Sequence, residues 1–253
     1  MLHPAKADVA RAARSAEREL KRLARPAHNF DASRYFRGDH NLGFYNVGTD
    51  RMRELARSIQ LAHQSWTVDD AMAFADVLMP NRYLDVKNVA ISLVARYRRS
   101  FVPRLLPRWK RWFSANQSAN WATTDAICGE LIGPLLLEHP TLADGFGVWS
   151  THRNMWVRRA SIVGLIALAR RGQSLDVLYG NAKRLHADDQ DLIQKAVGWA
   201  LREAGKADEA RLERYLRANG PSIPRTTVRY AIERFPPRAR AELLLATRPS
   251  ANS

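Results

Sequence analysis

The sequence has one cysteine, Cys128, among 253 residues. A single cysteine excludes an intramolecular disulfide framework and a metal site built from several cysteines. No apolar run approaches the roughly 18 residues that a transmembrane helix needs, and the N-terminus lacks the apolar core of a signal peptide. We therefore expect an intracellular protein of the bacterial cytoplasm, associated with the nucleoid and not with a membrane.

Motifs of cofactor and metal enzymes are also missing. The seven histidines are scattered, and no pair has the spacing of metal ligands on one helix. The chain has no glycine loop for phosphate, no G-x-S-x-G and no H-E-x-x-H. A Ser-His-Asp or Cys-His catalyst stays open, although no spacing indicates one, and Cys128 on an apolar helix face is expected to be a core thiol. We expect neither a cofactor nor a metal.

Acidic residues are few for the number of basic ones. Against 40 Lys and Arg stand 25 Asp and Glu, which gives a net charge of +15 and a pI near 10.7. Only seven of the basic residues are Lys, and the planar fork of Arg fits a phosphate with two hydrogen bonds. The charge predicts a polyanionic partner. Nucleic acid is favoured over an anionic membrane, because no helix is basic on one face and aromatic on the other.

Strand signals are scarce, and helical periodicity continues from about residue 50 onward. Proline and glycine at the ends of many segments mark short turns, which favour antiparallel neighbours. The pattern predicts an all-α chain with helices near 50–64, 67–79, 81–98, 101–113, 119–137, 141–149, 154–171, 174–186, 188–204, 207–218, 222–234 and 236–246.

A repeat runs through these helices. Aligning Asn88, Thr124, Arg159, Lys195 and Thr227 gives successive spacings of 36, 35, 36 and 32 residues. A period in the mid-thirties with two helices per unit is typical of an α-solenoid close to the HEAT or TPR range. We predict a superhelix of HEAT-like repeats whose aligned positions recur on one wall of a concave basic groove. A globular helical bundle with similar helices is the alternative.

The composition divides the chain further. Residues 1–30 read as a basic N-terminal helical arm, residues 31–247 as the repeat domain and residues 248–253 as a disordered tail. The stretch "NFDASRYFRGDHNLGFYNVGTD" is expected to cap the first repeats. Tyr35 and Tyr45 in it are candidates for exposed stacking side chains, with the core as the alternative.

Four residues carry the candidate chemistry. Trp121 and Asp125 are four positions apart in "NWATTDAICGELIGPLL" and project from one helix face. Arg159 lies in "MWVRRASIVGL", and Trp199 lies one turn after Lys195 in "DLIQKAVGWALREAGK". In the repeat frame these residues converge on one wall. Each alone has a structural explanation, but an acid, two Trp and several basic residues together do not.

These three blocks, in this order and spacing, resemble the AlkD family of DNA alkylation-repair glycosylases. The resemblance extends from about Tyr35 to Phe235. It implies HEAT-like repeats and an enzyme that excises positively charged N3- and N7-alkylated purines from duplex DNA without a base-flipping pocket. It also implies that Asp125 is the catalytic carboxylate and that Trp121, Arg159 and Trp199 line the cleft.

The resemblance leads to a specific expectation. The chain is expected to be a monofunctional glycosylase that acts on alkylated duplex DNA as a monomer, without an obligate protein partner. The alternatives are a non-catalytic HEAT-repeat protein that senses distorted DNA and a scaffold for a protein partner. Residues expected to contact the DNA backbone are Tyr35, Lys195, Arg202 and Arg225.

Overall fold

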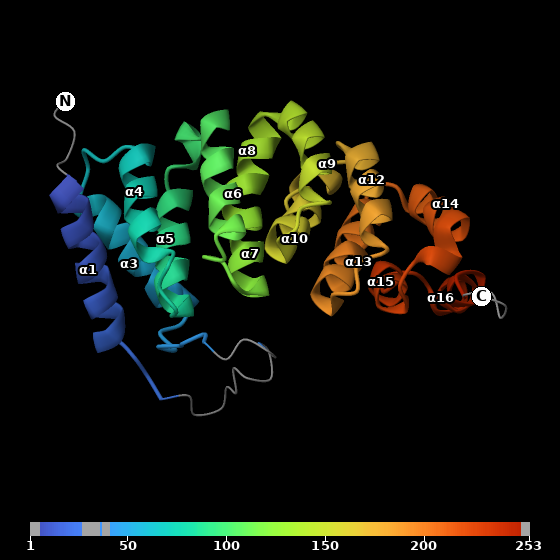
Figure 1. Cartoon of the computed structure of the whole chain (residues 1–253), viewed down its shortest axis with the longest axis horizontal. Coiled ribbons are helices and arrows are strands. Elements are labelled where there is room, and N and C mark those ends of the chain that lie inside the picture. The colour runs from blue at the N-terminus through green and yellow to red at the C-terminus, as the bar shows by residue number, and fades with distance from the viewer. Residues whose placement is uncertain (1–5, 27–35, 37–40, 249–253) are drawn as a thin grey trace. The chain divides into compact units, whose positions relative to one another are not determined.

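The computed structural model describes residues 6–26, 36 and 41–248. All regular elements among them are helices (Figure 1), and strand pairing in this part of the chain is limited to one isolated bridge between Gly43 and Tyr83. The prediction of an all-α repeat chain is confirmed. By their internal contacts the residues form two compact units, 1–131 and 132–253.

The first unit contains helices of one to five turns. They are α1 (Lys6–Arg22), α3 (Thr49–Ala62), α4 (Val68–Leu78), α5 (Leu84–Ala95), the 3-10 turns η1 (Arg98–Ser100) and η2 (Pro103–Leu105), α6 (Leu106–Ser114) and α7 (Trp121–Ile127). A single π-helical turn, η3 (Cys128–Ile132), follows α7.

The second unit continues with the same kind of elements. They are α8 (Gly133–Glu138), η4 (Pro140–Gly145), α9 (Phe146–Trp149), α10 (Met155–Val163), α11 (Ile166–Ala169), α12 (Leu175–Leu185), α13 (Asp191–Gly205), α14 (Glu209–Asn219), η5 (Gly220–Ser222), α15 (Arg225–Ala231) and α16 (Pro237–Ala246).

Each unit has two layers of helices. In the first unit α3, α5 and α7 contact one another in series, while α1 packs on α4 and α4 packs on α5. In the second unit α10, α13 and α15 form the corresponding series, with α9, α12 and α14 in the other layer. Alternating helices in two layers is the arrangement expected of helical-pair repeats. The concave basic groove stays a prediction.

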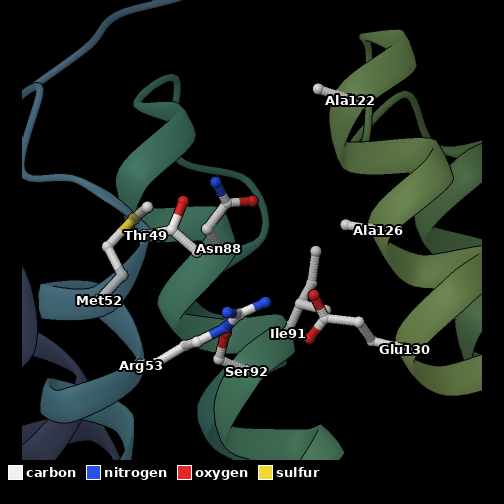
Figure 2. A pocket seen from close by; sticks show the side chains of 9 residues that line it. All are labelled: Thr49, Met52, Arg53, Asn88, Ile91, Ser92, Ala122, Ala126 and Glu130. Atoms are coloured by element: carbon white, nitrogen blue, oxygen red, sulfur yellow. The ribbon is translucent and has the colours of Figure 1, made fainter.

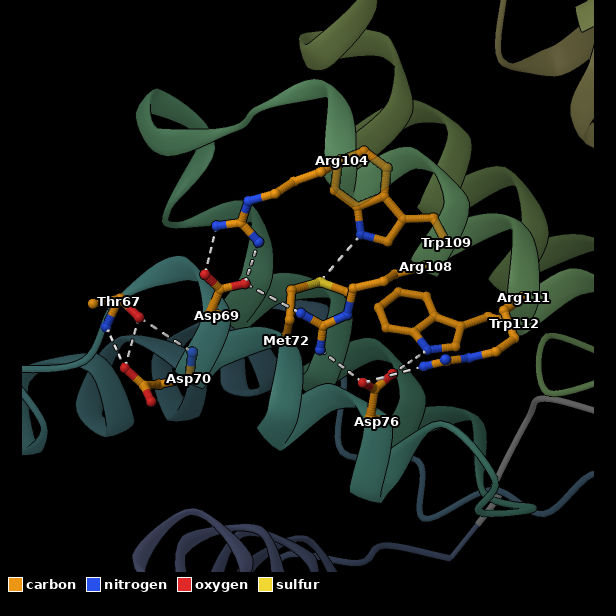
Figure 3. A network of polar contacts seen from close by, with 10 residues as sticks. All are labelled: Thr67, Asp69, Asp70, Met72, Asp76, Arg104, Arg108, Trp109, Arg111 and Trp112. Atoms are coloured by element: carbon orange, nitrogen blue, oxygen red, sulfur yellow. Dashed lines mark hydrogen bonds and ion pairs between the residues drawn. The ribbon is translucent and has the colours of Figure 1, made fainter. Parts of the chain in front are cut away.

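The helix α4 is joined to η2 and α6 by a polar network (Figure 3). Arg104 binds Asp69 with two hydrogen bonds of 2.7 and 2.6 Å. Asp76 accepts hydrogen bonds from Arg108, at 2.8 Å, and from the Trp112 indole, at 2.7 Å. Charged hydrogen bonds with two-pronged geometry fix orientation as well as distance. The network therefore ties η2 and α6 to α4.

Three predicted helices are interrupted, each at a proline or a glycine. Pro134 has no N–H for the carbonyl of Glu130, so the segment predicted as 119–137 contains the π-helical turn η3. Pro103 confines the start of the segment predicted as 101–113 to the 3-10 turn η2. The segment predicted as 154–171 breaks after Val163, where a Cβ on Gly164 would lie 2.9 Å from the Phe146 ring.

Three of the five aligned repeat positions are buried. Thr124, Arg159 and Thr227 are 0%, 5% and 1% exposed. The Thr227 hydroxyl donates to the Gln194 carbonyl at 2.9 Å, and Arg159 donates to the Leu192 carbonyl. Arg159 and Thr227 thus hold α13 against α10 and α15. The aligned residues therefore lie partly between helices, and not all of them face an exposed wall.

Candidate functional site

The start of α7 is defined by a side-chain cap. The Asn120 side chain accepts a hydrogen bond from the Thr123 N–H at 2.8 Å and donates to the Ser118 carbonyl at 2.7 Å. This satisfies one of the free N–H groups of the first turn. The helix therefore begins at Trp121 and carries Asp125 one turn later, both half-buried. The predicted pairing of these two side chains on one helix face agrees with this geometry.

The indole of Trp121 is held by a second ring. Phe36 stacks on it with centroids 5.4 Å apart and planes 16° apart. Phe44 contacts the other side of this small cluster, 5.4 Å from Phe36. Phe36 is 9% exposed, so the stack is part of the core of the first unit. Tyr35, the neighbouring residue that the sequence singled out, lies outside the described residues.

The helix α5 anchors the segments on either side of the site. The Asp85 carboxylate accepts the N–H groups of Tyr45 and Val47 at 2.8 and 3.0 Å. The Lys87 ammonium donates to the carbonyl of Gln117, in the turn before α7. Both side chains are buried. Charged hydrogen bonds in a dry interior are strong, and they fix the start of α7 relative to α5.

A pocket of about 200 Å³ lies between α7 and the helices α3 and α5 (Figure 2). Ala122 and Ala126, the next residues round α7, point into it from one side. The opposite wall comes from α3 and α5, and the floor holds the Glu130 carboxyl. Burial raises the pKa of Glu130, and the Arg53 charge opposes this rise. The lining residues are Thr49, Met52, Arg53, Asn88, Ile91, Ser92, Ala122, Ala126 and Glu130.

In the second unit Arg159 lies buried on α10. Its guanidinium donates to the backbone carbonyl of Leu192 at the start of α13. The adjacent Arg158 binds Asp188, whose side chain is 7% exposed, at 2.6 Å, just before α13. The two arginines therefore tie α10 to α13, and a contact between Arg159 and DNA stays a prediction.

Trp199 is half-buried on α13, next to the closest approach between α13 and α15. A Cβ on Gly198 would lie 2.6 Å from the Thr227 carbonyl, so only glycine permits this contact. Lys195, one turn before Trp199, has a 40% exposed side chain and pairs with Asp191 at 2.6 Å. Trp199 and Lys195 thus lie together on a helix whose position is tightly fixed.

Arg202 and Arg225 have internal partners. Arg202 pairs with Glu233 and lies 3.8 Å from the buried Glu203. Burial alone would raise the pKa of Glu203. Hydrogen bonds from Lys206 and Arg170 outweigh this effect, so the pKa of Glu203 lies below its ordinary value. Arg225 donates to the Leu244 carbonyl at 3.1 Å and the Thr247 hydroxyl at 3.0 Å.

The structure therefore groups the predicted residues in two sets. Trp121 and Asp125 lie on α7 of the first unit, while the second unit carries Arg159, Lys195, Trp199, Arg202 and Arg225. Their convergence on one wall stays a prediction. Sequence reasoning missed Phe36 and Glu130. The aromatic cluster around Tyr35 was a signal for the first. Glu130 shares a helix face with Ala122 and Ala126, but the opposite wall of the pocket comes from α3 and α5, and this segment gave no signal of it.

Within the described residues, no three His, Cys, Asp or Glu side chains are grouped in a way that would hold a metal ion. None of the helices in that part of the chain is both long and apolar enough to cross a membrane.

Comparisons with known proteins agree with the resemblance. A family model described as "DNA alkylation repair enzyme" matches residues 16–235. A solved structure of a predicted DNA alkylation repair enzyme from Enterococcus faecalis is similar, with a TM-score of 0.69. It is 17% identical, and the match covers 81% of this chain and 93% of that chain, which shows a shared fold. No curated protein matches the chain. Because the family match spans most of its length, the chain belongs to the DNA alkylation repair enzyme family.

Proposed function

We propose that the protein is a monofunctional DNA glycosylase that excises N3- and N7-alkylated purines, such as 3-methyladenine and 7-methylguanine, from duplex DNA. The observation that carries this proposal is Asp125, a half-buried carboxylate one helical turn from Trp121, on the helix whose Ala122 and Ala126 line a pocket. Membership in the alkylation repair family supports it. An acid at this place in a chain of net charge +15 needs a chemical reason.

The chemistry of the lesion supplies that reason. An N3- or N7-alkylpurine is already cationic, so the base leaves with the electron pair of the N-glycosidic bond and becomes neutral. Positive charge then develops on the deoxyribose as an oxocarbenium ion. A fixed carboxylate stabilises this charge and orients the water that attacks C1′. We assign both roles to Asp125.

The tryptophans account for selectivity. An indole face attracts a cation by about 0.5–2 kcal/mol, depending on how well water is excluded. Trp121, held in place by Phe36, and Trp199 are each proposed to pack against the sugar and backbone of the lesion nucleotide. Neutral bases gain nothing from this contact and are poor leaving groups. Cationic lesions are therefore the substrates.

DNA is proposed to be held through its phosphates. Lys195 is the exposed candidate, and Arg202, Arg159 and Arg225 would need to exchange or share their present partners. With six or more phosphates neutralised, the logarithm of affinity should fall with the logarithm of salt by about 0.9 per contact. A lyase step would need an amine nucleophile, for which Lys195 is only a remote candidate.

The competing function is a non-catalytic repeat protein that senses distorted DNA. A pure binder gains nothing from a carboxylate turned toward phosphates, so Asp125 favours the enzyme. The experiment is to incubate the purified protein with methylated duplex DNA and measure released bases by chromatography. We expect 7-methylguanine or 3-methyladenine well above the spontaneous rate. If bases are released only at the spontaneous rate with saturating protein, the glycosylase is excluded and the non-catalytic DNA-binding protein is favoured.

A further inference from the structure

The helix α1 has two sharply different faces. Val9, Ala13, Ala16 and Leu20 recur at helical spacing and are 5% exposed or less. They pack on α4 and α5. Glu17 accepts a hydrogen bond of 2.7 Å from Asn81, in the turn after α4. The helix is thus an integral part of the first unit, and its apolar face is already covered.

The opposite face is a stripe of positive charge. It consists of Arg11, Arg14, Arg18, Lys21 and Arg22, and all five side chains are exposed. At 3.6 residues per turn they project within an arc of about 100° that contains no acidic residue. We call these five residues the α1 basic face.

Few acids neutralise this face. Arg11 pairs with Asp8 and Arg22 pairs with Glu19, both within α1 and both with arginines that are at least 70% exposed. Such exposed pairs exchange readily for another anion. Arg14, Arg18 and Lys21 form no ion pair with any described residue. Three to five cations are therefore available to an external partner.

We propose that the α1 basic face binds the phosphate backbone of duplex DNA, as a contact separate from the lesion site. Arg11 and Arg22 are eleven residues apart, so the face is about 16 Å long and spans roughly five phosphates of one strand. Arginine forks suit phosphate oxygens. The choice of duplex DNA rests on the proposed function. The proposed contact is additional to that function, because Arg11 and Arg14 precede the segment that matches the family model.

A membrane fits this face poorly. Amphipathic helices that bind bilayers insert an apolar face between the lipids. In α1 that face is buried against α4 and α5, and the exposed residues include no aromatic side chain. A polyanion that needs only surface charge is the better partner.

The test compares two variants that each remove three charges. Arg14→Gln/Arg18→Gln/Lys21→Gln changes the α1 basic face, and glutamine keeps a good helix propensity. Arg98→Gln/Arg99→Gln/Arg171→Gln changes three exposed arginines in turns, and these form no ion pair with the described residues. Circular dichroism and thermal melts establish that both variants are folded.

Binding to an undamaged duplex of about 30 base pairs is then measured between about 50 and 200 mM salt. We expect the slope of log affinity against log salt to become shallower by about 2 to 3 in the α1 variant and to stay near the wild-type value in the control. An unchanged slope in the α1 variant, or equal changes in both variants, would overturn the proposal.

Two further arms identify the partner. The proposal is also overturned if the α1 variant loses binding to phosphatidylserine vesicles or to single-stranded RNA while its salt slope on duplex DNA stays unchanged. The undamaged duplex contains no base to release, so failure of the glycosylase assay leaves this result intact. Conversely, an α1 variant that excises bases fully and keeps the wild-type salt slope contradicts the proposed α1 contact but not the proposed glycosylase function.

Discussion

Phe36 and Trp121 are stacked with their ring centroids 5.4 Å apart and their planes 16° from parallel. The contact joins a residue more than eighty positions upstream to the first residue of α7. It fixes the indole that we propose to pack against the lesion sugar, so the N-terminal segment contributes to the site without touching the reacting atoms.

Removing the ring at Phe36 tests this support. We expect Phe36→Leu to lower kcat/KM for excision roughly tenfold, about 1.4 kcal/mol, because the indole loses its fixed orientation. The matched change Phe101→Leu removes a buried ring that packs edge-on against Trp109. It should cost comparable stability, of order 1 kcal/mol, with little loss of activity. Equal activity losses in the two variants would reduce the stack to a general packing contact.

Filling the pocket tests whether DNA approaches α7 there. In Ala126→Leu the larger side chain enters the space facing Asn88 and Ile91. We expect roughly tenfold weaker binding of a lesion duplex, about 1.4 kcal/mol, measured by fluorescence anisotropy. Gly129→Ala is the control, because its Cβ would meet no atom within 4 Å. Unchanged affinity in Ala126→Leu would contradict a close approach.

Most of the fold was predictable from periodicity and breakers. The helices from α3 onward begin and end within a few residues of their predicted bounds, except where a proline or glycine acts in the middle of a segment. The π-helical turn at Cys128 depends on the missing N–H of Pro134 in an otherwise continuous apolar pattern. The hydrophobic pattern alone does not reveal such a local defect, so it predicted one uninterrupted helix.

Lys195 and Arg225 should behave differently although both were predicted to contact DNA. Lys195→Gln removes an exposed ammonium, and we expect the salt slope to become shallower by about 0.9. Arg225→Gln leaves the Leu244 and Thr247 groups without their donor, and we expect a loss of about 1–3 kcal/mol in the free energy of unfolding. Salt titrations and urea unfolding of both variants check this. A steep slope change in Arg225→Gln without destabilisation would assign it to DNA.

His186 should make stability depend on pH. It is 8% exposed, and burial, followed by the Lys183 charge, lowers its pKa to about 4. The folded protein therefore excludes a proton that the unfolded chain binds near pH 6.5. The free energy of unfolding is therefore unaffected by His186 titration above about pH 6.5. It falls as the pH drops from 6.5 toward 4, by at most about 3 kcal/mol.

Urea unfolding at several pH values measures this effect. His186→Gln keeps a polar side chain that can hydrogen-bond the Tyr215 hydroxyl, which lies 2.9 Å from Nε2. The difference in unfolding free energy between wild type and variant should shrink from pH 7 to pH 4. A constant difference across that range would show that His186 does not titrate as inferred.

The site was less predictable than the fold. Trp121 and Asp125 follow from helical spacing, because four residues return to the same face. The burial of Arg159 does not follow from spacing, since a first-turn arginine reaches either solvent or the next helix, and here the Leu192 carbonyl accepts it. The Glu130 carboxyl follows Ala122 and Ala126 at four-residue steps, but the opposite wall of its pocket comes from α3 and α5, which are distant in the sequence. Such contacts arise from tertiary packing and leave no period in the sequence.

Asp125→Asn tests the central claim most directly, by release of 3-methyladenine and 7-methylguanine from methylated duplex DNA. Without the carboxylate the oxocarbenium ion loses its stabilising charge, and we expect turnover to fall by about 10²–10³-fold. Affinity for DNA should be retained or improved, because a charge that repels phosphates is removed. Glu130→Gln, which changes the other half-buried carboxyl of the same segment, should keep turnover within a few-fold of wild type. Release by Asp125→Asn at the wild-type rate, or loss of its DNA binding together with its fold, would contradict the catalytic assignment.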